Sequence, residues 1–166
     1  MRVLFVCTDN YTRSVTVEFC LKHYLKLQGK NGIEVFSAGF KSSSDLSKFS
    51  DVHFNRMDEL GIDTSTFQRR QFKVSFLEEF DVVVAMGIEH KEYVFAKYGK
   101  RISLFNQIYK QEETSIHVPP PDKEGIYLME IKNMVDYINS AMPIFLENLL
   151  SLPYSNKWNK EKPLGF

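Results

Sequence analysis

The sequence has few cysteines, no excess charge of either sign and no long apolar run. Cys7 and Cys20 are the only cysteines in 166 residues, too few for a disulfide framework. Lys and Arg total 21, as do Asp and Glu, so no net charge attracts nucleic acid or an anionic membrane surface. No stretch approaches the roughly 20 apolar residues of a membrane span. We therefore expect neither a nucleic-acid nor a membrane partner.

The start of the chain argues against a secreted protein, and the spacing of the histidines argues against a metalloprotein. The apolar residues 1–6 end at Cys7 and are too short for the core of a signal peptide. We therefore expect a reducing, cytoplasmic location, in which Cys7 stays a thiol. The four histidines show no metal-ligand spacing, so we expect no metal and no other cofactor. Nothing in the sequence assigns an oligomeric state.

Four short apolar segments alternate with amphipathic ones. The segments typical of buried strands are 2–6, 34–38, 81–86 and 101–105. Helical spacing is found at 14–27, in a segment ending at Leu60, and at 74–80, 88–98 and 126–150. This alternation predicts an α/β fold: a four-stranded parallel sheet, doubly wound, with helices on both faces. Residues 1–150 would form one domain and residues 151–166 a C-terminal tail.

The junction between the first strand and the first helix is the first candidate site, because doubly wound sheets bind ligands where strands end and helices begin. A cysteine and an arginine lie there with five residues between them, in the order Cys7-Thr8-Asp9-Asn10-Tyr11-Thr12-Arg13-Ser14. A loop of this length can turn successive N–H groups toward one phosphate, while Arg13 holds two phosphate oxygens. The same positive field favours the Cys7 thiolate, which is the nucleophilic form. The pattern predicts a phosphate-binding loop with a cysteine nucleophile; a buried cysteine and a surface arginine would be the plain alternative.

Several residues of this loop have an individual expected role. Asn10 tolerates a left-handed backbone and would brace the loop. Ser14 could cap the helix, form a hydrogen bond within the loop, or donate to the sulfur as it leaves. Tyr11 and Tyr127 could hold an aromatic ring between them, although ordinary half-buried tyrosines would explain both equally well.

The segment from Val6 to Ser14 resembles the phosphate loop of the low-molecular-weight protein tyrosine phosphatase family. Further similar segments keep the family's order over about residues 1–150, and these are Ser37-Ala38-Gly39, Asp58-Glu59-Leu60-Gly61-Ile62-Asp63, and Phe80-Asp81-Val82-Val83-Val84-Ala85-Met86 followed by His90. The resemblance implies a four-stranded parallel sheet and a metal-independent phosphatase that works through a phosphocysteine. The implied substrate is a phosphorylated protein or a small aryl phosphate, with phosphotyrosine expected first. Thr8, Asp9, Tyr11 and Thr12 would then line the substrate.

The sequence departs from the family's pattern at several positions. Asp9 stands where glycine is usual, and it puts a carboxylate near an anion site. Thr12 stands where a second cysteine is frequent, so no disulfide within the loop can protect Cys7. Gly87 stands where an aspartate often follows the methionine. Residues 41–47 are rich in serine where many relatives have an aromatic wall, and only Phe40 lies nearby.

The resemblance also implies a general acid, which the family takes from an Asp-Pro pair on a late loop. That place is occupied here by Pro119-Pro120-Pro121-Asp122, and Pro120 stands in strict register with the expected aspartate. Asp122 is the first candidate for the acid, Glu124 the second and His117 the third. A solvated loop aspartate would be the plain alternative for Asp122.

A non-catalytic domain that binds phosphate or a phosphoprotein is one competing function on this fold. Asp9 and the displaced acid favour it. The intact Cys7, Arg13 and Ser14 argue against it, because a pure binding domain need not keep a nucleophile. Loss of activity in Cys7→Ser would separate the two.

A thiol-coupled arsenate reductase shares this kind of loop and is a less favoured alternative. Such an enzyme needs further cysteines to pass a disulfide along, and none follows Cys20. Cys20 lies among Val17, Phe19 and Tyr24 on the first helix, so we expect it in the core.

Overall fold

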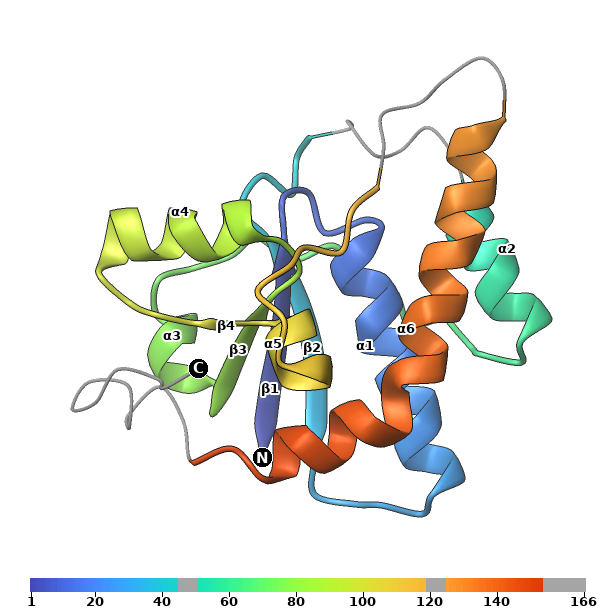
Figure 1. Cartoon of the computed structure of the whole chain (residues 1–166), viewed down its shortest axis with the longest axis horizontal. Helices are drawn as coiled ribbons and strands as arrows, with labels where there is room; N and C mark the ends of the chain where they lie inside the picture. Colours follow the sequence, from blue (N-terminus) through green and yellow to red (C-terminus); the bar gives the residue numbers. More distant parts are fainter. Residues whose placement is uncertain (45–50, 119–124, 154–166) are drawn as a thin grey trace.

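A four-stranded parallel sheet forms the centre of the molecule (Figure 1). The computed structural model describes residues 1–44, 51–118 and 125–153. The strands are β1 (Arg2–Cys7), β2 (Glu34–Gly39), β3 (Val82–Ala85) and β4 (Ser103–Leu104), and their order across the sheet is β2-β1-β3-β4. Every pairing between them is parallel. The predicted α/β fold with a four-stranded parallel sheet is confirmed.

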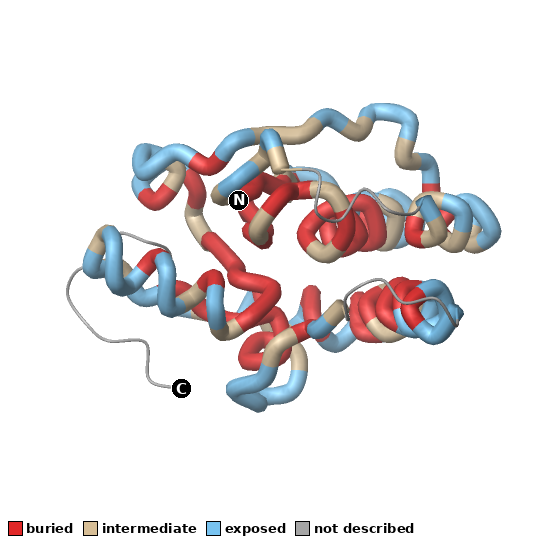
Figure 2. Tube along the Cα trace, turned by 90° about the horizontal axis from the view of Figure 1, so that it is seen from above, coloured by how far each residue is buried: buried red, intermediate tan, exposed pale blue. Residues whose placement is uncertain are grey.

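Helices cover both faces of this sheet (Figure 1). One face packs against α1 (Arg13–Leu27), α2 (Val52–Glu59), α5 (Phe105–Lys110) and α6 (Ile126–Leu150), and the other against α3 (Phe76–Glu79) and α4 (Ile88–Tyr98). The central strand shows why, because Val3 and Phe5 belong to one core and Leu4 and Val6 to the other. Figure 2 shows the buried residues running through the strands and along the helices beside them.

The prediction of a strand over residues 101–105 is wrong at both ends. β4 is confined to Ser103 and Leu104, and Phe105 begins α5, a helix that the sequence analysis did not predict. Gln107 caps this helix, since its Oε1 accepts the Leu104 N–H at 2.8 Å. The Phe105 ring stacks on Phe145 of α6 with centroids 4.5 Å apart. This packing against α6 outweighs the strand tendency of the local sequence.

The other expected elements lie close to their predicted bounds, and those of α4 and α6 coincide with them. The expected tail is described only as far as residue 153, so its boundary stays a prediction. Within the described ranges, no helix is both long enough and apolar enough to cross a membrane.

The chain after β1 passes directly over the end of β2. The N–H groups of Phe40 and Lys41 donate to the carbonyls of Cys7 and Thr8 at 3.2 and 2.7 Å. A Cβ on Gly39 would lie 2.6 Å from the Asn10 nitrogen and 2.9 Å from the Thr8 oxygen. Because these are backbone atoms, they cannot swing aside as a flexible side chain would. Glycine is therefore required at position 39 by this close approach.

We expect Gly39→Ala to lower the free energy of unfolding by about 2 kcal/mol, as overpacking typically does, and to displace residues 8–10. Gly29→Ala is the matched control, because a Cβ there meets nothing within 4 Å and only the φ of 63° opposes it. Urea denaturation gives the stability, and the rate at which iodoacetate alkylates Cys7 reports on the loop. The control should lose stability without a change in that rate. A Gly39→Ala protein with the wild-type rate would contradict the close approach.

Candidate active site

Residues 7–14 connect the end of β1 to the first turn of α1, as the strand-to-helix pattern predicts. Cys7 ends β1 and is only 1% exposed, while Arg13 begins α1. In the described part of the chain, the N–H groups of Asn10, Tyr11 and Thr12 donate to no acceptor, and the buried Thr12 Oγ1 has no hydrogen-bond partner. Unused N–H groups at a helix N-terminus can bind an anion.

The Cys7 sulfur lies against a hydroxyl of the helix. Its Sγ is 2.9 Å from Ser14 Oγ, and that oxygen accepts a hydrogen bond from Asn10 Nδ2 at 3.1 Å. The hydroxyl hydrogen of Ser14 can therefore point at the sulfur. The alternative role of Ser14 as a helix cap is wrong, because Thr12 is the N-cap residue and Ser14 lies within the first turn.

Asn10 ties the loop to two distant segments. Its φ is 53°, the left-handed backbone that the sequence predicts. Its Nδ2 also donates to Ser37 Oγ of β2 at 2.8 Å, and its Oδ1 accepts the Arg70 N–H at 2.8 Å. Asn10 is fully buried, so losing any of these partners would leave a polar group unsatisfied. The bracing role predicted for this residue has a structural basis in these bonds.

The guanidinium of Arg13 contacts two segments that follow β3 and β4, on the other side of β1 from β2. Its Nη1 donates to Glu89 Oε1 of α4 at 2.9 Å and to the Ile116 carbonyl at 3.2 Å. The side chain of Arg13 is 18% exposed and that of Glu89 is 54% exposed. Sequence analysis did not identify Glu89, because nothing in the local pattern distinguishes it from an ordinary charge on a helix surface.

His90 forms a hydrogen bond with the side chain of Thr8 in the loop. Its Nδ1 accepts the Gly87 N–H at 3.1 Å, so the ring proton is on Nε2, which donates to Thr8 Oγ1 at 3.0 Å. Burial and then the charge of the nearby Arg13 lower the pKa of His90 to about 4, against the opposing charge of Glu89. The ring is therefore neutral near pH 6, and the Thr8 hydroxyl hydrogen can face an anion in the loop.

An aromatic wall borders the loop, and we define it as Tyr11, Phe54 and Phe67. The ring of Tyr11 meets those of Phe54 and Phe67 edge-on, with centroids 5.5 and 5.9 Å apart. The Tyr11 hydroxyl donates to Asp51. Burial and this hydrogen bond raise the pKa of Tyr11 to about 12, so it stays protonated. Sequence analysis missed both phenylalanines. The only local signal was that Phe67 is an isolated aromatic residue in a polar turn.

Tyr127 lies in the core at the start of α6 and is 4% exposed. Burial and then the negative charge of Asp9 raise its pKa, so the phenol reaches the vicinity of the loop. Tyr11 packs on Phe54 and Phe67. The expected pairing of Tyr11 and Tyr127 around a substrate ring stays a prediction.

Asp9 is 6% exposed, and its carbonyl accepts hydrogen bonds from the Arg69 guanidinium at 2.9 and 3.1 Å. The Arg69 guanidinium therefore lies at the backbone of the residue that replaces the usual glycine.

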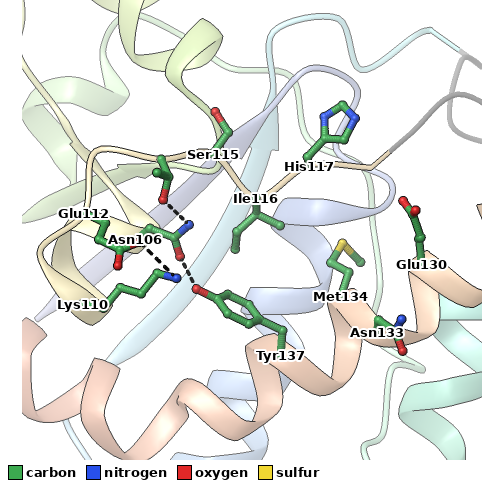
Figure 3. Close-up of a pocket in the computed structure, with 11 residues that line it drawn as sticks. Asn106, Lys110, Glu112, Ser115, Ile116, His117, Glu130, Asn133, Met134 and Tyr137 are labelled. Carbon is green, nitrogen blue, oxygen red and sulfur yellow. Dashed lines mark hydrogen bonds and ion pairs between the residues drawn. The ribbon is translucent and has the colours of Figure 1, made fainter.

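The candidates for the general acid are not all described. Asp122 and Glu124 lie outside the described residues, so their roles stay predictions. His117 is exposed and lines a cavity of about 520 Å³ between the segment after α5 and α6 (Figure 3). Neither Cys7 nor Arg13 lines that cavity. His117 directly follows Ile116, whose carbonyl accepts a hydrogen bond from Arg13, and its role as an acid stays a prediction.

Cys20 is fully buried in the core, as expected, and both cysteines are free. Burial, helped by Asp136, raises the pKa of the Cys20 thiol to about 12. A thiol of this kind is a poor partner for disulfide exchange, which argues against a reductase. Across the described ranges, no group of three or more His, Cys, Asp or Glu side chains is arranged to hold a metal ion.

Comparison with known proteins agrees with this geometry. The family model for low molecular weight phosphotyrosine protein phosphatase matches residues 2–152. No curated protein matches the sequence. Among solved structures, a low molecular weight protein tyrosine phosphatase from T. tengcongensis is 26% identical, with a TM-score of 0.73 over 89% of this chain and 98% of that one.

Two further solved structures share the fold. The YwlE arginine phosphatase from Geobacillus stearothermophilus is 23% identical, with a TM-score of 0.72 over 90% of this chain and 93% of that one. Wzb from Vibrio vulnificus, in complex with benzylphosphonate, is 22% identical, with a TM-score of 0.66 over 88% and 97%. The resemblance predicted from the loop is confirmed by the family model.

The two buried histidines beside the loop should make folding sensitive to acid. Burial lowers the pKa of His53, as of His90, to about 4. Since the unfolded chain then binds more protons below about pH 6.5, the free energy of unfolding should fall as pH drops toward 4. Between pH 7 and 5 each histidine should cost roughly 2 kcal/mol.

Urea denaturation at pH 7 and pH 5 measures this loss. His53→Gln keeps a donor for the Tyr11 carbonyl, which His53 Nε2 contacts at 2.8 Å, and should reduce the loss by roughly 2 kcal/mol. His23→Gln, on the partly exposed side of α1, is the control. An unchanged pH dependence in His53→Gln would show that this histidine is already charged in the folded state.

Proposed function

The chain belongs to the low molecular weight phosphotyrosine protein phosphatase family and is a cysteine-based phosphatase, and from this premise we propose that it hydrolyses phosphate monoesters through a phosphocysteine at Cys7. The observation that carries the proposal is the 2.9 Å contact between Cys7 Sγ and Ser14 Oγ at the start of α1. A hydroxyl donor and the positive end of a helix dipole thus lie beside the sulfur that would attack. The loop N–H groups and Arg13 supply positive charge for the phosphate beside it.

In the first step the Cys7 thiolate attacks phosphorus in line with the bond to the leaving oxygen. The S–P bond forms as the P–O bond breaks, and the leaving oxygen takes a proton from Asp122. Two of the three non-bridging phosphate oxygens lie on the Arg13 fork, and the third accepts from N–H groups of the loop and the Thr8 hydroxyl. Charge that builds on these oxygens in the transition state is thereby stabilised.

In the second step water hydrolyses the phosphocysteine. The Asp122 carboxylate, left ionised by the first step, takes a proton from the water as its oxygen bonds to phosphorus. The S–P bond breaks, and the Ser14 hydroxyl donates to the departing thiolate. Inorganic phosphate is released and Cys7 is regenerated. Because this cycle requires a reduced sulfur, we expect the protein to act in a reducing compartment.

The proposed substrate class is phosphotyrosine in a phosphorylated protein, or a small aryl phosphate. The aromatic wall supports it, because edge-on and offset contacts between rings favour an aromatic leaving group at the mouth of the loop. Its Phe54 and Phe67 provide the aromatic surface that the serine-rich segment 41–47 does not. Benzylphosphonate, the ligand in the Wzb structure, likewise carries an aromatic ring next to its phosphorus group.

We expect reduced, metal-free protein to release phosphate from an aryl phosphate between about pH 5 and 7. Cys7→Ser should abolish turnover, because the alcohol is a far weaker nucleophile. Asp122→Asn should lower kcat by about 100-fold, with Glu124→Gln as the matched control. A loss confined to Glu124→Gln would assign the acid to Glu124. Wild-type protein that binds phosphate without turnover would instead support the non-catalytic binding domain.

The aromatic wall should select aryl substrates. Phe67→Ala should raise KM for a phosphotyrosine peptide by about fivefold, and leave inhibition by inorganic phosphate unchanged. Phe95→Ala removes an exposed ring from α4 and is the control. Steady-state kinetics on phosphotyrosine, phosphoserine and phosphoarginine peptides checks this prediction. A preference for phosphoarginine that survives Phe67→Ala would overturn the proposed substrate class.

A further inference from the structure

The guanidinium of Arg13 is held by acceptors at Nη1, while Nη2 lies 3.4 Å from His90 Nε2, which carries the ring proton and cannot accept from it. Arg13 Nη1 donates to Glu89 Oε1 at 2.9 Å and to the Ile116 carbonyl at 3.2 Å, which uses both hydrogens of that nitrogen. In the described part of the chain, Arg13 Nε has no acceptor. The edge formed by Nε and Nη2 thus remains for two oxygens of a phosphate.

The Ile116 carbonyl is itself fixed by two neighbouring bonds. The Ile116 N–H donates to the Met86 carbonyl at 2.9 Å, and Ser115 Oγ accepts the Ile88 N–H at 2.8 Å. Figure 3 shows Ser115, Ile116 and His117 following one another along this segment. The segment is therefore tied to the junction between β3 and α4, and Glu89 lies in the first turn of α4.

The carboxylate of Glu89 occupies the space that a side chain at position 87 would enter. A Cβ on Gly87 would lie 2.6 Å from Glu89 Oε1 and 2.5 Å from Oε2. The backbone of Gly87 does not require glycine, since its φ of −138° and ψ of 160° are extended. The missing side chain at this position is what leaves room for Glu89 beside Arg13.

We propose that Glu89 is a positioning residue for Arg13. Gly87 has no side chain, and Glu89, two residues further along the chain, supplies a carboxylate in its place. This inference rests on the proposed function, because the orientation of Arg13 matters only if the loop holds phosphate. Glu89 acts through Arg13 and does not touch the substrate.

Glu89 supports phosphate binding and does not compete with it. It takes Nη1, whereas the phosphate takes the opposite edge of the guanidinium. Partial burial alone would raise the pKa of Glu89, but its own backbone N–H, the nearby His90 and the bond to Arg13 outweigh burial and hold that pKa below its ordinary value. The carboxylate is therefore ionised wherever the enzyme works. As an exposed ion pair contributes little to folding, its effect falls on the orientation of Arg13.

The test compares the wild type with Glu89→Ala, Gly87→Asp and the double variant Gly87→Asp/Glu89→Ala. Glu92→Ala, one turn further along α4, is the control. One readout is kcat/KM on an aryl phosphate. The other is the concentration of inorganic phosphate that protects Cys7 from iodoacetate, which needs no turnover.

Glu89→Ala should lower kcat/KM by about tenfold and weaken phosphate protection by a similar factor. The double variant should recover most of both, because the new carboxylate enters the space that Glu89 vacates. Gly87→Asp alone should fall below the wild type, since two carboxylates then crowd one guanidinium. Recovery in the double variant distinguishes positioning from a general loss of stability, and urea denaturation of all the variants measures that stability directly.

Tighter phosphate protection in Glu89→Ala would overturn the inference and make Glu89 a competitor. A double variant no better than Glu89→Ala would also overturn it. If the wild type is protected by phosphate but does not turn over, the proposed function fails, while the protection series still tests Glu89. If phosphate does not protect the wild type at all, Arg13 holds no phosphate and the inference falls.

Discussion

The site depends on the hydrogen bonds of the buried Asn10 side chain. This side chain joins the loop to Ser14 on α1, to Ser37 on β2 and to the backbone of Arg70. These bonds hold a left-handed residue in the middle of the loop and orient the serine that contacts Cys7. Without them, neither the sulfur nor the unused N–H groups would be fixed in position. The rest of the site can be understood as further support for this arrangement.

Arg13 is supported from the opposite direction. While Asn10 ties the loop to β2, Glu89 and the Ile116 carbonyl tie the arginine to the segments that follow β3 and β4. The loop therefore spans the middle of the sheet and is anchored on both sides of β1. This placement follows from the order β2-β1-β3-β4, because β1 lies between the two strands that carry these supports.

The fold and the chemical centre could be predicted because their signals are local. β1 is a continuous apolar run buried on both faces, and Cys7 and Arg13 stand within one short segment. Phe105 was misassigned because its helix depends on stacking against Phe145, a contact no local pattern reveals. Glu89 was missed for the same reason, since it lies 76 residues from Arg13 in the sequence. The sequence showed that Gly87 departs from the family's pattern, but the structural consequence of that glycine depends on where the Glu89 carboxylate lies.

The bonds of Asn10 also link the assembly of the site to the folding of the whole domain. Its partners Ser37 and Arg70 are 27 and 60 residues away, so the loop has its shape only after distant parts of the chain have come together. Partly folded forms have no anion site to offer. If the loop binds phosphate as proposed, phosphate binds the native state alone, and at 100 times its Kd it adds about 2.7 kcal/mol to native stability. The anion that the proposed reaction releases would then also favour the folded state of the enzyme that releases it.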